Sequence, residues 1–561
     1  MTAINLPTAG IRHAAAAVLV ALAASGPALG QQKFYPDDPL TKEPPPLPTI
    51  GTEPRGLSDV LEFVANTLGR PGERQPAPAV IPAGGTSTLG EVLDGPWYVN
   101  RHATRRMTPD ELRRGPGHAS PPSREAPWQA LNAKQFDVRP GILVADARNE
   151  LYLLRFDPPD HLEMATGAEI VASKIFHALG YHVPENYIVY FTRDGIVASP
   201  YGGRITSAGT ERRLTEEDID VFLKGVAKDP TRGYRAVATR VAGDWRGLLG
   251  PYRVYGTRSD DPNDIVPHEH RRDLRGLFVF SAWLNHSRIR ALNTMDVLVE
   301  EGGTPFIRHL LLDFVTTLGA GEGGPKSARD GHEAPYDWRQ AVKHAAGFGF
   351  YTPQWMKADY PGLPAVGRFE YETFDPERWT PNQDLAPFAN RLRDDEFWAA
   401  KQVMAFTDED IRVLVSTGEY SDPAAAEWIA TCLMERRDRI GRTYFSKVVP
   451  LDRFRIESGS LTFDDLAIVH GLASARQYGV RWAQLDNATG VLTWIDGEDT
   501  FALSRRLREA PAGAYDAARV WIDDPDTNVT VYLRTTGGGA EVVGVERGWP
   551  NKVLADARTD R

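Results

Sequence analysis

Cysteine is almost absent from this chain, whose 561 residues include one, Cys432. A single thiol cannot form an internal disulfide, so the fold has to be stabilised by its core. The sequence is 42% hydrophobic and 25% charged, which is enough apolar material for such a core. The chain also lacks a Gly-x-Ser-x-Gly motif, and Cys432 has no nearby histidine. We therefore expect Cys432 to pack in the core and do not expect nucleophilic hydrolysis.

Apolar runs long enough to span a membrane are absent as well. The run from Ala14 to Ala24 is shorter than the roughly 20 residues that a membrane helix needs. Arg12 and His13 precede it and small residues follow at 27–30, a pattern typical of a cleavable secretory signal. We expect residues 1–30 to be a signal peptide, the mature chain to have no membrane span, and the location to be periplasmic or secreted.

Positive charge is in short supply, with 64 Lys and Arg against 75 Asp and Glu and a formal net charge of −11. Proteins that bind nucleic acid present basic patches to the phosphate backbone, and an acidic exported chain is a poor match. Nucleic acid is therefore not an expected partner. A small anionic ligand or a protein partner is expected instead.

The composition and the predicted secondary structure of the chain change at about residues 30, 130, 200 and 450. Residues 31–130 are rich in Pro and Gly and predict an extension, with an extended leader at 31–60. A small α+β unit at 131–200 and a helical unit at 201–449 follow, and short β-type runs predict a C-terminal β-sandwich or sheet at 450–561. The expected fold class is α+β.

Local patterns predict the elements of these units. Two strands at 141–146 and 151–156 form a hairpin, and a helix at 169–179 ends at Gly180 before a strand at 187–191. Further helices are predicted at 215–226, 268–284, 396–416 and 423–447. The strands expected in the C-terminal domain are 461–468, 480–485, 491–495, 518–522 and 529–533.

Two short stretches contain the candidate functional residues. The first has a cation, Arg155, on the second strand of the hairpin and Glu169 on the helix that follows. The second reads Asn285-His-Ser-Arg288-Ile-Arg290-Ala-Leu-Asn293, and Asp313-Phe-Val comes about 20 residues later, after an apolar run. A strand cation, a helix glutamate, a loop ending in Asn and an Asp-Phe pair occur in the order found in protein kinases.

On these motifs the chain from about 134 to 447 resembles an atypical kinase-like family of exported bacterial proteins, distantly related to the HipA and CotH type of kinase fold. The segment Tyr255–Gly276 also looks like a family signature. The resemblance implies a two-lobed protein-kinase-like core, with a small lobe at 131–200 and a helical large lobe at 201–449. It also implies ATP and Mg²⁺ as cofactors, with Asn293 and Asp313 as metal ligands.

The sequence departs from that family pattern at three positions. Arg155 replaces the strand Lys that holds the nucleotide phosphates and pairs with the helix glutamate, here Glu169. Arg288 stands at the position of the catalytic Asp, and a guanidinium cannot accept the substrate proton, so no residue can be assigned as catalytic. Losing a general base lowers the rate by about 10²–10⁴-fold. Val315 replaces the Gly of Asp-Phe-Gly, which restricts the backbone there.

Other features of the sequence have plainer explanations. The acidic run Asp260 to Asp264 with His268 and His270 suggests a metal site, but histidines two residues apart point to different faces of a helix. Helix capping near Pro267 explains much of this segment. Aromatic residues of the C-terminal domain suggest either a sugar-binding face or, as we favour, core packing: Trp482, Trp494, Trp521 and Tyr532.

Three functions follow from the sequence. The leading hypothesis is a pseudokinase that binds a nucleotide or another phosphorylated or anionic ligand through Arg155, Glu169 and Arg290. The second is an active atypical phosphotransferase that uses ATP and metal with a relocated base. The third is an envelope binding or scaffold protein whose C-terminal β domain carries recognition.

Overall fold

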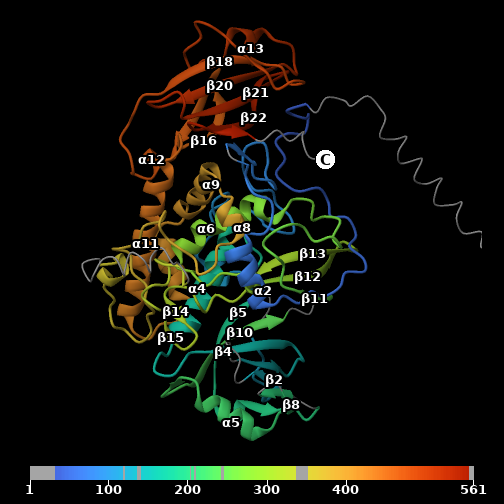
Figure 1. Ribbon diagram of the computed structural model, residues 1–561, viewed down its shortest axis with the longest axis vertical. Coiled ribbons are helices and arrows are strands. Elements are labelled where there is room, and N and C mark those ends of the chain that lie inside the picture. Colours follow the sequence, from blue (N-terminus) through green and yellow to red (C-terminus); the bar gives the residue numbers. More distant parts are fainter. Residues whose placement is uncertain are drawn as a thin grey trace, which may run out of the picture.

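The computed structural model describes residues 32–76, 78–117, 121–134, 141–201, 204–207, 210–241, 245–335 and 352–554. The predicted signal peptide lies outside these residues. The fold is mixed α+β with several sheets, as predicted from the sequence. Figure 1 shows one sheet at the bottom of the view, helices in the middle and a second large sheet at the top.

The lower sheet contains the hairpin predicted from the sequence. Its strand order is β5-β10-β4-β3-β2-β7-β8, with β6 beside β2 and β9 beside β10. The predicted hairpin and the strand after it are confirmed as β3, β4 and β5. The strands are β2 (Trp128–Lys134), β3 (Gly141–Ala145), β4 (Leu151–Phe156), β5 (Asn186–Phe191), β6 (Ile196–Ala198), β7 (Arg204–Ser207), β8 (Thr210–Arg213), β9 (Lys228–Asp229) and β10 (Gly233–Val241). The predicted helix at 215–226 is α5 (Glu216–Lys224), which packs Ile219 and Phe222 against this sheet.

The helix α4 (Met164–Leu179) joins β4 to β5, and local chemistry fixes both of its ends. At the start, the buried Asp157 carboxylate accepts hydrogen bonds from the backbone N–H groups of Glu163, Ala165 and Thr166, each at 2.8 Å. These donors have no partner within the helix, so the carboxylate replaces the missing turn. At the end, Gly180 has φ 129°, and a Cβ there would overlap the Tyr98 ring. The helix therefore stops where the sequence predicted.

A second sheet and a group of helices make up the middle of the molecule (Figure 1). The sheet is the three-stranded β11-β12-β13, and its β12–β13 hairpin follows the short helix η4 (Ala291–Asn293). The predicted helix at 268–284 is η3 followed by α6, and the one at 423–447 is α11, in which Cys432 is fully buried as expected. The elements are β11 (Gly247–Gly250), η3 (His268–His270), α6 (Arg272–Trp283), β12 (Thr294–Glu301), β13 (Thr304–Leu311), β14 (Ala320–Gly321), β15 (Gly324–Pro325), α8 (Ala386–Ala389) and α11 (Pro423–Phe445).

One helix prediction is wrong in detail. The helix predicted at 396–416 is two helices, α9 (Arg393–Met404) and α10 (Asp408–Ser416). Thr407 begins the second one by accepting a hydrogen bond from the Asp410 N–H, while the Asp410 carboxylate accepts one from the Thr407 N–H. This reciprocal capping box favours a new helix start over continuation of the old one.

The C-terminal domain is a single five-stranded sheet with a hairpin beside it, in the order β19-β18-β20-β21-β22. Its core includes Trp482, Val520 and Val531, all fully buried. Four of the predicted strands are present within a few residues of their expected bounds. The strand predicted at 461–468 is wrong in its second half, because the Asp465 carboxylate accepts hydrogen bonds from the Ala467 and Ile468 N–H groups and begins the helix α12 at Leu466. The elements are β16 (Leu451–Glu457), β17 (Ser460–Asp465), α12 (Leu466–Val469), β18 (Gly479–Leu485), β19 (Leu492–Trp494), α13 (Arg505–Glu509), β20 (Tyr515–Trp521), β21 (Asn528–Thr536), β22 (Gly539–Gly548) and β23 (Val553–Leu554).

The N-terminal segment up to residue 127 runs along the other parts and contacts several of them. Phe34 is buried against Tyr532 of the C-terminal sheet, so the expectation of an extended leader outside any core is wrong at this residue. Strand β1 (Ala79–Val80) pairs in parallel with β23. The segment also contains α2 (Asp59–Val64), the π-helical turn η1 (Ala65–Gly69) and α3 (Pro109–Arg114). Within the described residues, no helix is both long and apolar enough to cross a membrane.

Candidate functional site

Three of the predicted site residues meet at the end of the β12–β13 hairpin. Arg155 points from β4 towards Asp313, which follows β13, and its Nη1 donates to the Asp313 Oδ1 in an ion pair. The Arg155 side chain is 18% exposed and the Asp313 side chain 2%. Asp313 has φ 68°, a left-handed conformation that Asp tolerates better than most residues. The turn after β13 thus aims this carboxylate at β4.

Asn293 holds the other side of the same carboxylate. Its Nδ2 donates to the Asp313 Oδ2 at 3.1 Å, and its Oδ1 accepts from the Arg290 backbone N–H at 3.0 Å. Both carboxylate oxygens of Asp313 therefore face donors of the protein itself. Arg155, Asn293 and Asp313 therefore lie in contact at one place.

This arrangement does not suit the expected magnesium ion. Mg²⁺ binds through oxygen ligands in nearly octahedral geometry. Here Asn293 turns its amide nitrogen towards Asp313 and its oxygen away, and the Arg155 guanidinium stands next to the carboxylate where a cation would bind. Among the described residues, no group of three or more His, Cys, Asp and Glu side chains is placed to hold a metal.

The loop arginines, predicted to flank a phosphate, each have a carboxylate partner elsewhere. Arg288 Nε lies 3.4 Å from the Asp330 Oδ2, and Arg290 forms an ion pair with Asp59 of α2. The arginines are 40% and 21% exposed, so solvent reaches both pairs. The described contacts therefore do not bring Arg288 and Arg290 to Asp313.

Glu169, the predicted partner of the strand cation, is buried in the second turn of α4. Its Oε1 accepts a hydrogen bond from Asn186 Nδ2 at 3.3 Å. Close by, the Phe314 ring stacks on Phe176 of α4 with centroids 4.9 Å apart and lies 6.1 Å from the His286 ring. This aromatic stack ties α4 to the loop and to the Asp-Phe turn.

A buried lysine beneath the loop was not found by sequence reasoning. Lys326 Nζ donates to the Asn285 carbonyl at 2.7 Å and to the Ser287 Oγ at 2.9 Å. Burial lowers the pKa of Lys326 to about 7. No motif marks this residue, because it lies in an irregular segment that only the tertiary fold brings under the loop.

A cavity of about 1060 Å³ adjoins this loop at Asn285 and Asp330. Among the described residues, no carboxylate lies within ion-pair distance of four arginines in its wall, Arg368, Arg436, Arg439 and Arg442. Arg436 is buried and donates to the carbonyls of Glu370 and Ala282, both at 2.7 Å, and burial lowers its pKa to about 10. The wall also carries acidic residues, so its charges are mixed.

The acidic run with two histidines is a structural cluster. His268 Nε2 lies 2.8 Å from the Asp264 Oδ2, whereas His270 Nε2 lies 3.2 Å from the Glu73 Oε2. Asp260 pairs with Arg55 and Arg258. The two histidines have separate partners, as expected from their spacing, and these contacts fasten the N-terminal segment to the start of α6.

The aromatic residues of the C-terminal domain, for which we favoured core packing over a sugar-binding face, differ in burial. Trp482 is fully buried, and the Trp521 ring covers Gly479. Trp494 lies beside the guanidinium groups of Arg481 and Arg519. Core packing, which we favoured from the sequence, therefore accounts for Trp482.

No protein-family model matches this chain, and no curated protein matches it either.

Proposed function

We propose that this protein is a pseudokinase, a kinase-like protein that does not transfer phosphate. The sequence order that suggested a kinase has a counterpart in space, since Arg155, Asn293 and Asp313 lie in contact. Arg155 is on the third consecutive strand of its sheet, where protein kinases carry their phosphate-binding Lys. A helix with a buried glutamate, α4, follows that strand.

The observation that carries the proposal is the occupation of Asp313. In kinases this carboxylate binds Mg²⁺, which neutralises the phosphate charge. Here the Arg155 guanidinium neutralises it, and Arg cannot be deprotonated to release the pair. Arg288 at the base position cannot accept a proton, and its own partner is Asp330. The arrangement thus places a guanidinium beside the carboxylate that would bind a metal, and a residue that cannot accept a proton at the base position.

An anionic ligand of this pseudokinase would bind without a metal ion. The arginines of the 1060 Å³ cavity beside the loop supply planar guanidinium groups that suit phosphate or carboxylate. Three of these arginines are on α11, and Arg436 is buried with its guanidinium on the carbonyls of Glu370 and Ala282. Arg439 and Arg442 are therefore the candidates to bind the ligand.

The experiment compares ATP binding by the purified chain with MgCl₂ and with EDTA, by thermal shift, and assays phosphate transfer from labelled ATP. We expect the ATP-induced shift to be the same in both buffers and no transfer to occur. Arg439→Met with Arg442→Met should remove the shift. Arg378→Met is the matched control, because Arg378 lines the same cavity but already pairs with Asp375. A magnesium-dependent shift, or transfer abolished by Asp313→Ala, would contradict the proposal.

A further inference from the structure

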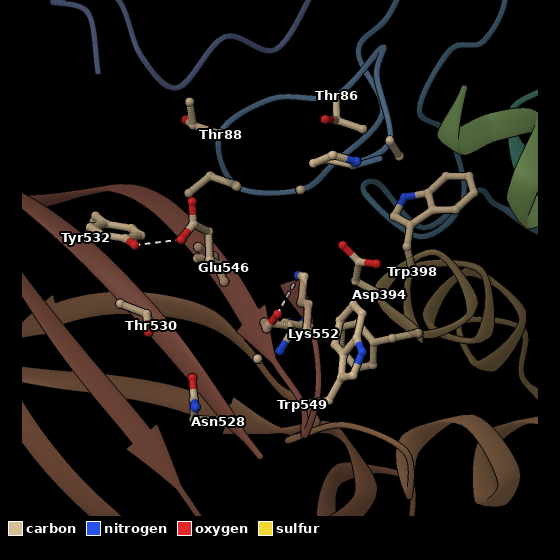
Figure 2. A pocket seen from close by; sticks show the side chains of 18 of the residues that line it. Thr86, Thr88, Asp394, Trp398, Asn528, Thr530, Tyr532, Glu546, Trp549 and Lys552 are labelled. Atoms are coloured by element: carbon tan, nitrogen blue, oxygen red, sulfur yellow. Dashed lines mark hydrogen bonds between the residues drawn. The ribbon is translucent and has the colours of Figure 1, made fainter. Parts of the chain in front are cut away.

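A separate cavity, of about 670 Å³, lies where three parts of the chain meet. Figure 2 shows the C-terminal sheet with Asn528, Thr530 and Tyr532 on one side and α9 with Asp394 and Trp398 on the other. The loop 82–91 of the N-terminal segment crosses above them, and the turn at 549–552 closes the lower side. None of the residues of the kinase-like motifs lines this cavity.

Among the described residues, two buried polar atoms of the cavity wall have no hydrogen-bond partner. One is the Nε1 of Trp398, a residue that is 1% exposed. The other is the Oδ1 of Asp394, whose Oδ2 accepts from Arg272 Nη2 at 2.8 Å. Leaving a buried donor or acceptor unsatisfied destabilises the free protein. A hydroxyl group both donates and accepts, so a ligand rich in hydroxyls would satisfy both atoms.

Two cations of the same wall, Arg519 and Lys552, have no carboxylate within ion-pair distance in the described part of the chain. Arg519 approaches Thr530 Oγ1 at 3.5 Å and the Trp494 ring at 4.5 Å, and Lys552 Nζ donates to the Arg547 carbonyl at 2.7 Å. Burial lowers the pKa of Lys552, while the more distant charges of Asp394 and Glu546 raise it. Cations without a direct ion-pair partner favour a ligand with negative charge.

The remaining wall suits a sugar ring. The Trp549 ring lies under Lys552 Nζ at 4.0 Å and offers an apolar face with a polar edge. Asn528 and Thr530 add an amide and a hydroxyl from β21, and Figure 2 shows Thr86 and Thr88 on the opposite loop. Small-molecule pockets have volumes of about 300–1,000 Å³, a range that admits one or two sugar rings here.

We propose that this cavity binds an acidic saccharide, with a sugar ring on Trp549, hydroxyls on Asp394 and Trp398, and the carboxylate near Arg519 and Lys552. The proposal does not depend on the pseudokinase assignment. Of the aromatic residues considered from the sequence, Tyr532 lines this cavity, and Trp549 and Trp398, which belong to a turn and to α9, complete its aromatic wall.

The test titrates the full chain with glucuronate and galacturonate and with the neutral hexoses glucose and galactose. Calorimetry and tryptophan fluorescence report binding, since Trp398 and Trp549 line the cavity. We expect a uronate to bind with a Kd of about 1 mM or tighter and at least about tenfold more tightly than its neutral parent. Absence of binding by every sugar overturns the proposal, and equal binding of neutral and acidic sugars overturns the assignment of an acidic ligand.

Variants locate the binding site. Trp549→Ala and Arg519→Met should each weaken uronate binding at least about tenfold, which corresponds to about 1.4 kcal/mol. Trp549→Phe, which keeps an aromatic ring, should retain binding and controls for folding. Trp521→Ala and Arg505→Met are matched controls, since neither residue lines the cavity. Asp313→Ala should leave uronate binding unchanged. Unaltered affinity of Trp549→Ala and Arg519→Met would overturn the proposal.

Discussion

The site at Asp313 and the 670 Å³ cavity differ in whether their cationic side chains have ion-pair partners within the protein. Around Asp313, every predicted site arginine has a carboxylate partner: Arg155, Arg288 and Arg290 pair with Asp313, Asp330 and Asp59. In the cavity, Arg519 and Lys552 have none among the described residues, and Trp398 Nε1 is unsatisfied. In the first region the arginines form ion pairs within the protein. In the second, Arg519 and Lys552 can form an ion pair with a ligand.

This difference shows that a resemblance in motif and a capacity to bind are separate properties. Arg155, Asn293 and Asp313 lie in contact, yet the charges of Arg155 and Asp313 pair with each other. Charged groups that are left unpaired near a cavity are costly to the free protein and are a better guide to a ligand.

The largest effect should come from Asp313→Ala. The substitution leaves the partly buried Arg155 without its carboxylate, and it leaves Asn293 Nδ2 with only the backbone carbonyl of residue 313, at 3.5 Å. Removing one partner of a buried pair costs about 3–5 kcal/mol, and we expect about 3 kcal/mol because Arg155 retains some contact with water. Urea denaturation measures the change. A loss below about 1 kcal/mol would show that the pair is not a structural one.

A pair of arginine substitutions compares the two regions directly. Arg155→Met leaves the Asp313 carboxylate buried without its cation and should destabilise the protein by about 2 kcal/mol. Arg519→Met leaves no carboxylate behind and should change stability by less than about 0.5 kcal/mol. Both values come from the same denaturation experiment. Equal losses at the two positions would remove the contrast.

The buried Lys326 predicts a pH dependence of stability. Its pKa falls from 10.5 to about 7 in the folded protein, so between these values the unfolded state binds more protons. Stability should therefore rise with pH from about 7 to about 10, by up to about 1.4 kcal/mol per unit, and level off above that. Lys326→Met should lose this part of the slope. An identical slope in the variant would mean that Lys326 remains charged in the fold.

The smallest effect concerns the exposed pair between Asp59 and Arg290. Asp59 is 45% exposed, so Asp59→Asn should cost less than about 1 kcal/mol. The change frees Arg290 and should increase the stabilisation that inorganic phosphate gives. Asp110→Asn is the matched control, because Asp110 pairs with the exposed Arg113 far from the loop. Equal responses of both variants to phosphate would show that freeing Arg290 creates no anion site.

Much of the fold could be predicted from local patterns. The β3–β4 hairpin, α4 up to Gly180, and α11 follow from apolar periodicity and from turn and capping residues. The break between α9 and α10 was missed because the capping box of Thr407 and Asp410 lies inside a continuous apolar pattern. Burial of Phe34 could not be predicted, since its contact with Tyr532 joins distant parts of the chain.

The candidate sites, like the fold, could be predicted from the sequence only in part. The order of Arg155, Asn293 and Asp313 in the sequence was sufficient to predict that they meet. The partners of Arg288 and Arg290 were not predictable, because Asp330 and Asp59 belong to irregular or distant segments without a motif. The cavity lined by Trp549 was also missed, since its wall is assembled from three separate parts of the chain.

The sequence alone determined the α+β class and most element bounds, since these depend on residue type and local spacing. Only the tertiary structure decided which charges are paired and which remain available. Ion pairs and cavities depend on distances of a few ångströms between residues far apart in the chain, and no local pattern encodes those distances.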